Sequence, residues 1–318
     1  MGGIVNQACR SDLTVTRLAH MPETARLGVG DVAPALVLTD VQGEQVTVDP
    51  AAHRATVVVF TSNGCPYALA WHDRIQDVAR EYADRDVSVV QVVSNDELLQ
   101  PKDSRAAMAA RVERGEVAGA FLRDKDQSAA RAFGATATPE VFVVDASGVV
   151  RYHGAPDRDF DDPGLRAEWL RDGLDAVLEG REPEVASTPP AGCSVKWRVE
   201  LLYWEGCPSH PRAEELLGET LREMHREDVR VQRVEVTSQA QAEERGFPGS
   251  PTFQAGGADL FPEPDSPPAL ACRVYAQDDG RVSPLPSAAQ LESRLREALV
   301  RPWELPGWVD FRQQTATS

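Results

Sequence analysis

The sequence contains two copies of one local pattern, in which a strand-like apolar run, a Cys-Pro pair and a helix-like pattern follow one another. The first copy has the run TVVVFTS before Cys65 and Pro66, and the second has KWRVELLYW before Cys207 and Pro208. A continuous β-branched run is typical of a central strand that is covered on both faces. Each copy therefore predicts a buried strand that leads through a cysteine into a helix.

The length of 318 residues predicts two domains, each long enough to bury a core of its own. A segment rich in proline, serine and glycine separates the two copies and is expected to be an extended arm. We expect these segments: a disordered lead-in (1–27), a first domain (28–180), an arm carrying Cys193 (181–196), a second domain (197–301) and a tail (302–318).

Charge and hydropathy exclude two classes of function. The net charge of -17 argues against a nucleic-acid partner, which needs a basic face; such acidity also simply favours solubility. No apolar run is long enough for a transmembrane helix, so no membrane partner is expected. The lead-in lacks the apolar core of a signal peptide, and translation starts at Met1 or at Met21. We therefore expect a cytoplasmic protein in a reducing compartment.

Strand and helix patterns alternate in both halves. This alternation predicts an α/β fold, in which helices cover both faces of a mixed central sheet. In the first half we expect strands at 35–40, 45–49, 56–62, 87–94 and 119–124, a hairpin at 140–154, and helices at 66–84, 104–115, 127–134 and 164–179. In the second half we expect strands at 196–204, 229–236 and 250–261, a hairpin at 269–282, and helices at 211–226 and 287–299.

The Cys-Pro pairs are placed for thiol chemistry. Proline suits the first helical position, so Cys65 is expected at a helix N-terminus, where free N–H groups and the helix dipole stabilise a thiolate. The thiolate is the nucleophilic form of cysteine. The same argument applies to Cys207, and His210, one turn further along, can add positive charge or transfer a proton.

Other interpretations of these cysteines are also open. Each can be a buried, inert residue at a turn. Cys207 and His210 supply only two ligands, whereas a closed zinc site needs four, so no metal is expected. No glycine-rich phosphate loop follows a strand, so no organic cofactor is expected either.

Two prolines stand immediately before strands, far along the chain from each cysteine. Thr138-Pro139 and Ser250-Pro251 are candidate cis peptide bonds opposite Cys65 and Cys207. In that place the backbone before the proline can pair with an extended thiol substrate. An ordinary proline at the start of a strand is the alternative.

The first half resembles a known family. The residues that carry the resemblance are NGCPY at 63–67, RAFGATATPEVFVVDASGVVRYHGAPD at 131–157 and PPAGCSVKW at 189–197. They resemble the thioredoxin-like redoxins, in the alkyl hydroperoxide reductase and thiol-specific antioxidant branch, which is peroxiredoxin-like. In the second half, YWEGCPSHP, FPGSPTF and CRVY resemble small thioredoxin-like proteins. The resemblance implies two tandem thioredoxin-like folds.

The sequence departs from both redox motifs of these families. Ala68 and His210 stand where thioredoxins have the second cysteine of Cys-x-x-Cys. Peroxiredoxins carry Pro-x-x-x-Thr-x-x-Cys, and here Val58 replaces the proline while Ser62 supplies the hydroxyl. Arg151 is the candidate for the arginine that holds peroxide in that family.

Two cysteines elsewhere are candidates for a second thiol. Cys193 lies in the arm, which can fold back so that Cys193 resolves an intermediate on Cys65. Cys272 can serve Cys207 in the same way, although its place in a predicted hairpin strand also fits a buried structural role. Without a second thiol nearby, Cys207 would capture partners as persistent mixed disulfides.

These features predict a thiol-disulfide oxidoreductase with peroxiredoxin-like antioxidant activity. Cys65 attacks a disulfide or peroxide, and an external dithiol such as a thioredoxin resets the enzyme. The residues expected to position substrate are Ser62, Asn63, Pro139, His210 and Pro251. The alternative is a non-catalytic binding or adaptor module that holds thiol partners in the groove beside the proline.

Overall fold

The apolar run found in the sequence forms the central strand of a seven-stranded sheet in a computed structural model, which describes residues 26–263 and 266–305. Strand β3 (Ala55–Thr61) pairs in parallel with β4 (Val87–Val93) and antiparallel with β7 (Glu140–Asp145). The strand order is β2-β1-β5-β4-β3-β7-β8. The remaining strands of this sheet are β1 (Leu36–Thr39), β2 (Gln45–Val48), β5 (Ala120–Arg123) and β8 (Val150–Gly154).

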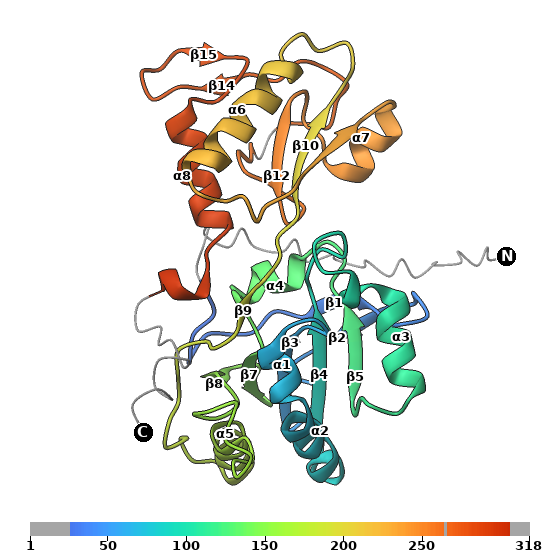
Figure 1. The fold of residues 1–318 in the computed structure, drawn as a ribbon, viewed down its shortest axis with the longest axis vertical. Helices are drawn as coiled ribbons and strands as arrows, with labels where there is room; N and C mark the ends of the chain where they lie inside the picture. Colours follow the sequence, from blue (N-terminus) through green and yellow to red (C-terminus); the bar gives the residue numbers. More distant parts are fainter. Residues whose placement is uncertain (1–25, 264–265, 306–318) are drawn as a thin grey trace, which may run out of the picture.

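Helices cover both faces of this sheet, because successive side chains of a strand point to opposite sides. Val57 and Val59 pack with the buried residues of α2 and α5, whereas Val58 and Phe60 pack with those of α4. Figure 1 shows α2 and α5 side by side at one end of this part of the molecule. The helices are α1 (Pro66–Ala70), α2 (His72–Glu81), α3 (Arg105–Glu113), α4 (Ser128–Phe133) and α5 (Glu168–Glu179), with 3-10 turns at Ala83–Arg85 and Pro101–Asp103. The mixed α/β architecture predicted from the sequence is confirmed.

Two details of the first half differ from the prediction. The expected helix at 66–84 is broken at Trp71, whose indole is buried and donates to Asp157 over 2.7 Å. The expected lead-in ends earlier than residue 27: Leu27 is buried in the core, and Arg26 forms an ion pair with Glu140 over 2.8 Å. The expectation for residues 1–25 lies outside the described residues.

The second half has its own four-stranded sheet, in the order β11-β10-β12-β13. Leu201 and Leu202, neighbours on β10, enter two different apolar clusters, so this sheet is also covered on both faces. Leu201 packs with residues of α6 and α8, and Leu202 packs with Ala242 of α7. The strands are β10 (Val199–Tyr203), β11 (Val231–Glu235), β12 (Thr252–Ala255) and β13 (Ala258–Asp259). The helices are α6 (His210–Glu223), α7 (Gln239–Arg245) and α8 (Ala288–Ala298), followed by a 3-10 turn at Pro302–Glu304.

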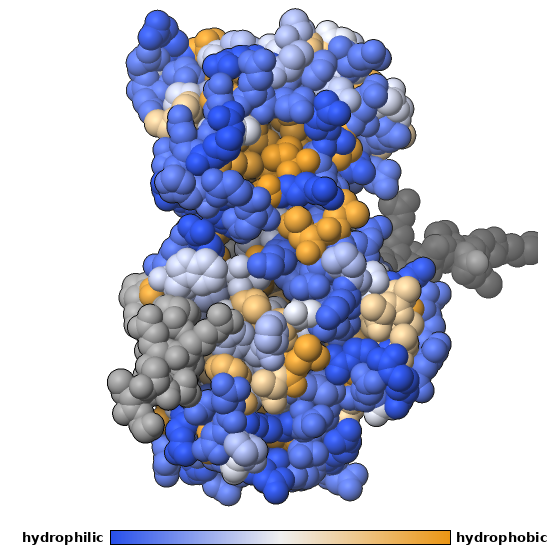
Figure 2. All heavy atoms as spheres, viewed as in Figure 1, coloured by the Kyte–Doolittle hydropathy of each residue, from blue (hydrophilic) through white to orange (hydrophobic). Residues whose placement is uncertain are grey.

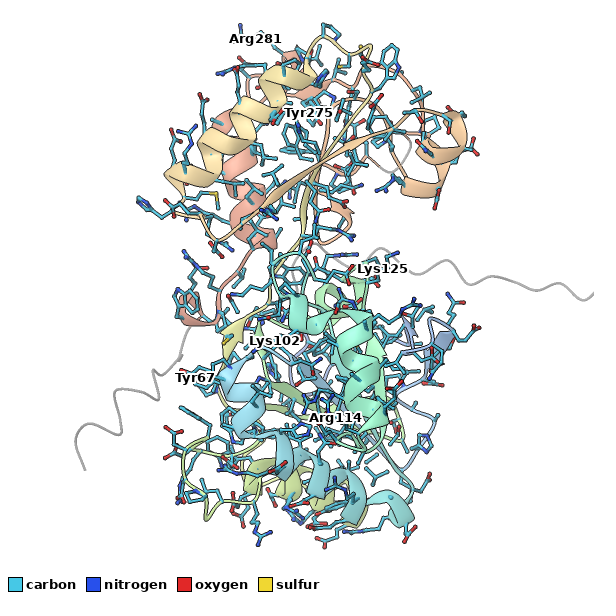
Figure 3. All side chains as sticks on the ribbon, turned by 45° about the vertical axis from the view of Figure 1, so that its right-hand side comes forward. Tyr67, Lys102, Arg114, Lys125, Tyr275 and Arg281 are labelled. Atoms are coloured by element: carbon cyan, nitrogen blue, oxygen red, sulfur yellow. The ribbon has the colours of Figure 1, made fainter. Side chains whose placement is uncertain are left out.

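The predicted hairpin of the second half is short, with strands β14 (Tyr275–Ala276) and β15 (Val282–Ser283). The predicted cap of the last helix is confirmed, since Ser287 and Gln290 form a reciprocal capping box. In Figure 3, Tyr275 lies inside the second half, where its buried ring meets Phe253 and Phe261.

A second pair of short strands joins the arm to the first half. Strand β9 (Cys193–Ser194) pairs antiparallel with β6 (Ala137–Thr138), and the chain then continues directly into β10. From here on, residues 26–180 are called the first unit, 181–196 the arm, and 197–305 the second unit. Figure 1 shows the two units stacked end to end, with β9 lying against the first unit.

The surface is mainly hydrophilic, in keeping with the high net charge of the chain. On the face shown in Figure 2, hydrophilic side chains cover most of both units. Among the described residues, no helix is both long enough and apolar enough to cross a membrane.

Candidate functional site

Cys65 lies in the turn between β3 and α1, at the place the sequence predicts. It is the N-cap residue of α1, and Pro66 occupies the first turn of that helix. The backbone N–H of Ala68 points at the Cys65 Sγ over 3.5 Å. The Cys65 side chain is only 2% exposed. A helix start therefore offers a hydrogen-bond donor to the sulfur, as an N-cap does to any anion.

The predicted cis prolines are both present. The Thr138-Pro139 bond is cis, and the Thr138 carbonyl oxygen lies 2.8 Å from the Cys65 Sγ. Thr138 is also the residue that pairs with Cys193 across β6 and β9. The edge expected to receive an extended substrate is thus occupied by the arm of the same chain.

This pairing brings the arm cysteine onto Cys65. The Cys193 side chain forms a hydrogen bond with the Cys65 side chain, and both cysteines are reduced. Gly192 makes the approach possible, because a Cβ atom there would lie 2.1 Å from the Thr138 carbonyl oxygen. Such a contact with backbone cannot be relieved by a side-chain rotation, so the arm docks here only with glycine at this position.

The surroundings lower the pKa of Cys65 to about 6 from an ordinary value of 9.0. The hydrogen bond from Cys193 is the largest influence; burial acts in the opposite direction, and the side chain of Thr138 and the N–H of Ala68 lower the pKa further. The protonated thiol also has a partner, the Thr138 carbonyl oxygen, but the donors outweigh it. Cys65 is therefore mainly a thiolate at neutral pH.

Ser62 and Asn63, predicted to orient the substrate, are bonded instead to the protein itself. The Ser62 side chain interacts with the carboxylate of Asp103, and the Asn63 backbone N–H donates to that carboxylate over 2.6 Å. The Asn63 side chain donates to the Lys102 carbonyl oxygen over 2.9 Å and accepts from Arg111 over 2.8 Å. Both residues hold the turn before Cys65 in place, and neither is free to bind substrate in this arrangement.

The loop after β4 supplies site residues that sequence reasoning missed. Asp103 is fully buried beside the turn, and burial raises the pKa of its carboxyl group. The side chain of Gln100 lies over Gly64, so close that a Cβ there would be 2.2 Å from the Gln100 Oε1. Figure 3 shows Lys102 of this loop and Tyr67 of α1 at the same end of the first unit. The sequence signal is weak, because this loop has no periodic pattern.

A buried carboxylate fixes the strand that carries the cis proline. Glu140 is fully buried, and its carboxylate accepts the backbone N–H groups of Thr136 and Ala137 over 2.8 and 3.0 Å. It also contacts His153 over 2.6 Å and Arg26 over 2.8 Å. Burial opposes ionisation here, but these partners hold the pKa of Glu140 below its ordinary value. The ion-paired Glu140 carboxylate therefore fixes the backbone that leads to Thr138.

The second Cys-Pro turn differs from its predicted form. Helix α6 begins at His210, not directly after Cys207, so Pro208 is outside the helix and Cys207 is not its N-cap. His210 was expected to assist the thiol, but its Nδ1 contacts the Cys207 carbonyl oxygen over 2.9 Å and its ring stacks on Tyr203. The reason is that an extra turn separates the cysteine from the helix.

Cys207 nevertheless lies beside a cis proline and a second thiol. The Ser250-Pro251 bond is cis, and the Cys207 Sγ lies 3.3 Å from the Ser250 carbonyl oxygen. The buried structural role considered for Cys272 is wrong, because its side chain is exposed and hydrogen bonds with Cys207. It precedes the hairpin strands, in an irregular segment that runs past Ser250.

Arg151, the candidate for holding peroxide, is engaged elsewhere. Its side chain pairs with Asp145 over 2.6 Å and with Glu182 over 3.6 Å, at the β7–β8 hairpin. None of the strongest influences on the pKa of Cys65 is an arginine. The predicted peroxide-holding arrangement around Arg151 is therefore not formed.

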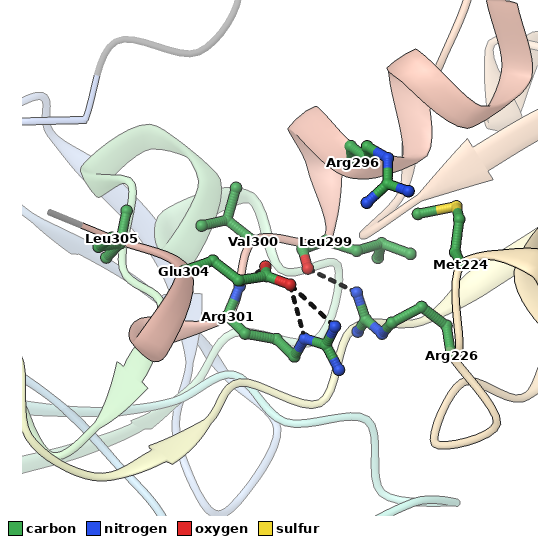
Figure 4. A pocket seen from close by; sticks show the side chains of 8 residues that line it. All are labelled: Met224, Arg226, Arg296, Leu299, Val300, Arg301, Glu304 and Leu305. Carbon is green, nitrogen blue, oxygen red and sulfur yellow. Dashed lines mark hydrogen bonds and ion pairs between the residues drawn. The ribbon is translucent and has the colours of Figure 1, made fainter. Parts of the chain in front are cut away.

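A cavity of about 410 Å³ lies between the C-terminal ends of α6 and α8 and the turn at Pro302–Glu304 (Figure 4). Three of its lining residues are arginines, and each has a carboxylate partner: Arg226 with Asp228, Arg296 with Glu292, and Arg301 with Glu304. No cysteine lines this cavity, so it is separate from both thiol pairs.

Comparisons with known proteins support the fold of the first unit. The family model described as Redoxin matches residues 28–167. A solved structure of a hypothetical protein from Sinorhizobium meliloti 1021 is 30% identical, with a TM-score of 0.51, and the match covers 54% of this chain and 96% of that one. An uncharacterized conserved protein from Geobacillus kaustophilus is 33% identical, also with a TM-score of 0.51, over 54% of this chain and 93% of that one. No curated protein matches the chain.

Proposed function

Because the chain belongs to the redoxin family through its thioredoxin-like first unit, we propose that it is a thiol-disulfide oxidoreductase in which Cys65 is the nucleophile and Cys193 the resolving thiol. The observation that carries the proposal is the pairing of β9 with β6, which sets the Cys193 side chain against Cys65. Disulfide exchange starts with attack by a thiolate, and a second thiol at this distance is placed to resolve the mixed disulfide that forms.

The reaction proceeds in two exchanges. The Cys65 thiolate attacks one sulfur of a substrate disulfide, the substrate S–S bond breaks, and the first substrate thiol leaves with a proton from solvent. Cys193 then loses its proton and attacks the Cys65 sulfur, and the second substrate thiol leaves with that proton. The substrate is reduced by two electrons and the protein holds a Cys65–Cys193 disulfide, which an external dithiol such as a thioredoxin reduces.

The arm must move for the substrate to enter. Cys65 is almost completely buried, and the backbone of Thr138 beside it is already paired with Cys193. An extended substrate that bonds to Thr138 therefore replaces the arm. Return of the arm then delivers Cys193 to the mixed disulfide, which couples product release to resolution.

Peroxide is the second candidate oxidant, because a thiolate with a pKa of about 6 is also the form that attacks peroxide. In that reaction the Cys65 thiolate attacks one peroxide oxygen, the O–O bond breaks, and water or an alcohol leaves with a proton from solvent. The Cys65 sulfenic acid is then attacked by Cys193, and the same disulfide forms as its hydroxyl leaves as water with the Cys193 proton. The engaged Arg151 and Ser62 favour a disulfide over peroxide as substrate.

The test uses the full-length chain, with oxidised glutathione and hydrogen peroxide as separate oxidants. We expect oxidised glutathione to give a Cys65–Cys193 disulfide in the wild type, a persistent glutathione adduct on Cys65 in Cys193→Ala, and no reaction at this site in Cys65→Ala. Peptide mass mapping reads out each product. A wild type that forms no Cys65–Cys193 disulfide with either oxidant contradicts the proposal and favours the binding-module alternative.

A further inference from the structure

The second unit holds a pair of thiols that the first site does not use. Cys207 is 2% exposed, and its sulfur lies against the carbonyl oxygen of Ser250. Cys272 forms a parallel β-bridge with the same Ser250. One residue, next to the cis proline, is therefore the neighbour of both cysteines.

The segment around Cys272 is fixed by its backbone. The Ser250 N–H donates to the Ala271 carbonyl oxygen over 2.8 Å, and the Arg273 N–H donates to the Ser250 carbonyl oxygen over 2.9 Å. Gly249 allows this close approach, because a Cβ there would lie 3.1 Å from the Ala271 carbonyl oxygen. Hydrogen bonds on both sides of Cys272 thus hold it in register with Ser250.

Arg273 anchors the segment from the side of the core. Its side chain is buried, pairs with Asp259 over 2.8 Å, donates to the Thr252 hydroxyl over 3.2 Å and lies over the ring of Tyr275. Cys272 directly precedes this anchor, yet its own side chain is exposed. The thiol is therefore held at the surface by a rigid neighbour and does not sit on a loose loop.

The two sulfurs interact. Cys272 hydrogen bonds with Cys207, and the pKa of Cys272 is raised first by desolvation and then by the charge of and hydrogen bond with Cys207. In the first unit the arm cysteine is likewise the more accessible member of the pair, and Cys65 the buried one. Both units thus place a buried Cys-Pro cysteine beneath a more accessible cysteine held next to a cis proline.

We propose that Cys207 and Cys272 form a second, self-contained dithiol–disulfide site, in which the exposed Cys272 exchanges with an external disulfide and the buried Cys207 closes the ring. In Figure 1 the loop between β10 and α6 lies at the end of the second unit farthest from the first unit. The second site therefore has its own access to solvent and does not depend on the Cys65 site for its oxidant.

The exchange is balanced as follows. Cys272 loses its proton and its thiolate attacks an external disulfide, whose S–S bond breaks, and the first external thiol leaves with a proton. Cys207 then attacks the Cys272 sulfur, and the second external thiol leaves with the proton that Cys207 gives up. The external disulfide is reduced by two electrons and a Cys207–Cys272 disulfide is formed.

The test removes the first site entirely, so its outcome is independent of the function proposed above. In full-length chain carrying Cys9→Ser, Cys65→Ser and Cys193→Ser, oxidised glutathione is the probe. We expect loss of both remaining thiols, a mapped Cys207–Cys272 disulfide and no retained glutathione. Adding Cys207→Ala should leave glutathione on Cys272, because no second thiol is present to displace it.

Adding Cys272→Ser in place of Cys207→Ala supplies the matched control at an exposed position. We expect oxidised glutathione to consume the Cys207 thiol at least about tenfold more slowly in this variant than in the parent protein that keeps Cys272. The reason is that the Cys207 sulfur is buried and exchange needs access. The proposal is overturned if the parent protein keeps glutathione on Cys272, if both thiols survive, or if Cys207 reacts equally fast without Cys272.

Discussion

At the scale of single residues, the reactivity of Cys65 depends on a neighbour that comes from far along the chain. The helix start contributes one donor, the Ala68 N–H, but the largest influence on the pKa of Cys65 is Cys193. The helix terminus alone predicts a lowered pKa for Cys65, which is the right direction, but it misses the largest cause. While the arm is docked, Cys193 therefore stabilises the thiolate form of Cys65.

This dependence predicts the pH profile of alkylation. In reduced protein, the rate of Cys65 alkylation by iodoacetamide should rise with pH through a midpoint at about 6, because only the thiolate reacts. Cys193→Ala should move the midpoint upward, since the pKa-lowering hydrogen bond is lost. Cys193→Ser keeps a donor and should stay nearer the wild type. A wild-type midpoint near 9.0, the ordinary value, contradicts the assignment.

The two Cys-Pro cysteines could be proposed as candidates from the sequence because their signals are local. An apolar run followed by Cys-Pro identifies Cys65 and Cys207 without any knowledge of the fold. The residues that hold the first turn, Asp103 and Gln100, come from a loop without hydrophobic periodicity, and their role depends on burial against the turn. Tertiary contacts of this kind leave no mark in a single sequence.

At the scale of elements, the arm acts as a short strand and not as a linker. Its proline-rich composition predicted an extended segment that can fold back, and β9 is that segment. The pairing partner was not predictable, because β6 is only two residues long and its position depends on the buried Glu140. Because Glu140 fixes β6, it also sets the register in which Thr138 pairs with Cys193.

The close approach at Gly192 gives a test of the docked arm. In Gly192→Ala, the new Cβ would lie 2.1 Å from the Thr138 carbonyl oxygen, so β9 must move away from β6. The Cys65–Cys193 disulfide should then form at least about tenfold more slowly with oxidised glutathione, because the effective concentration of Cys193 at Cys65 falls. Quenched-flow mass mapping measures this rate.

Gly218→Ala is the matched control for that variant. Gly218 lies in α6 with open space around its Cα, and alanine is favoured over glycine in a helix. Its disulfide rate at Cys65 should equal that of the wild type. An unchanged rate in Gly192→Ala as well would show that the docking of β9 does not govern resolution.

At the scale of the whole molecule, one buried side chain joins the two units. Gln127 is 1% exposed, and its amide nitrogen donates to the carbonyl oxygens of Ser94 and Lys196 over 2.6 and 2.9 Å. Its amide oxygen accepts the backbone N–H of Arg198 over 2.8 Å. A further bond runs from Gln232 of the second unit to Asp96 of the first, over 2.8 Å. The arm is thus held at its far end as well as at Cys193.

Removing that amide should loosen the junction and the nearby arm, and it should leave the Cys207–Cys272 pair unchanged. Gln127→Ala leaves the Arg198 N–H without its acceptor, which should lower the free energy of unfolding by about 1–3 kcal/mol. Hydrogen exchange at the Arg198 amide should accelerate, and Cys65–Cys193 disulfide formation should slow, because Cys193 lies just before the released segment. The Cys207–Cys272 disulfide should form at the wild-type rate, since Ser250 and Arg273 hold that pair within the second unit.

Gln239→Ala, at an exposed position, is the control for loss of a glutamine side chain. Equal slowing at both thiol pairs would mean that the two sites share one conformational change and do not act independently.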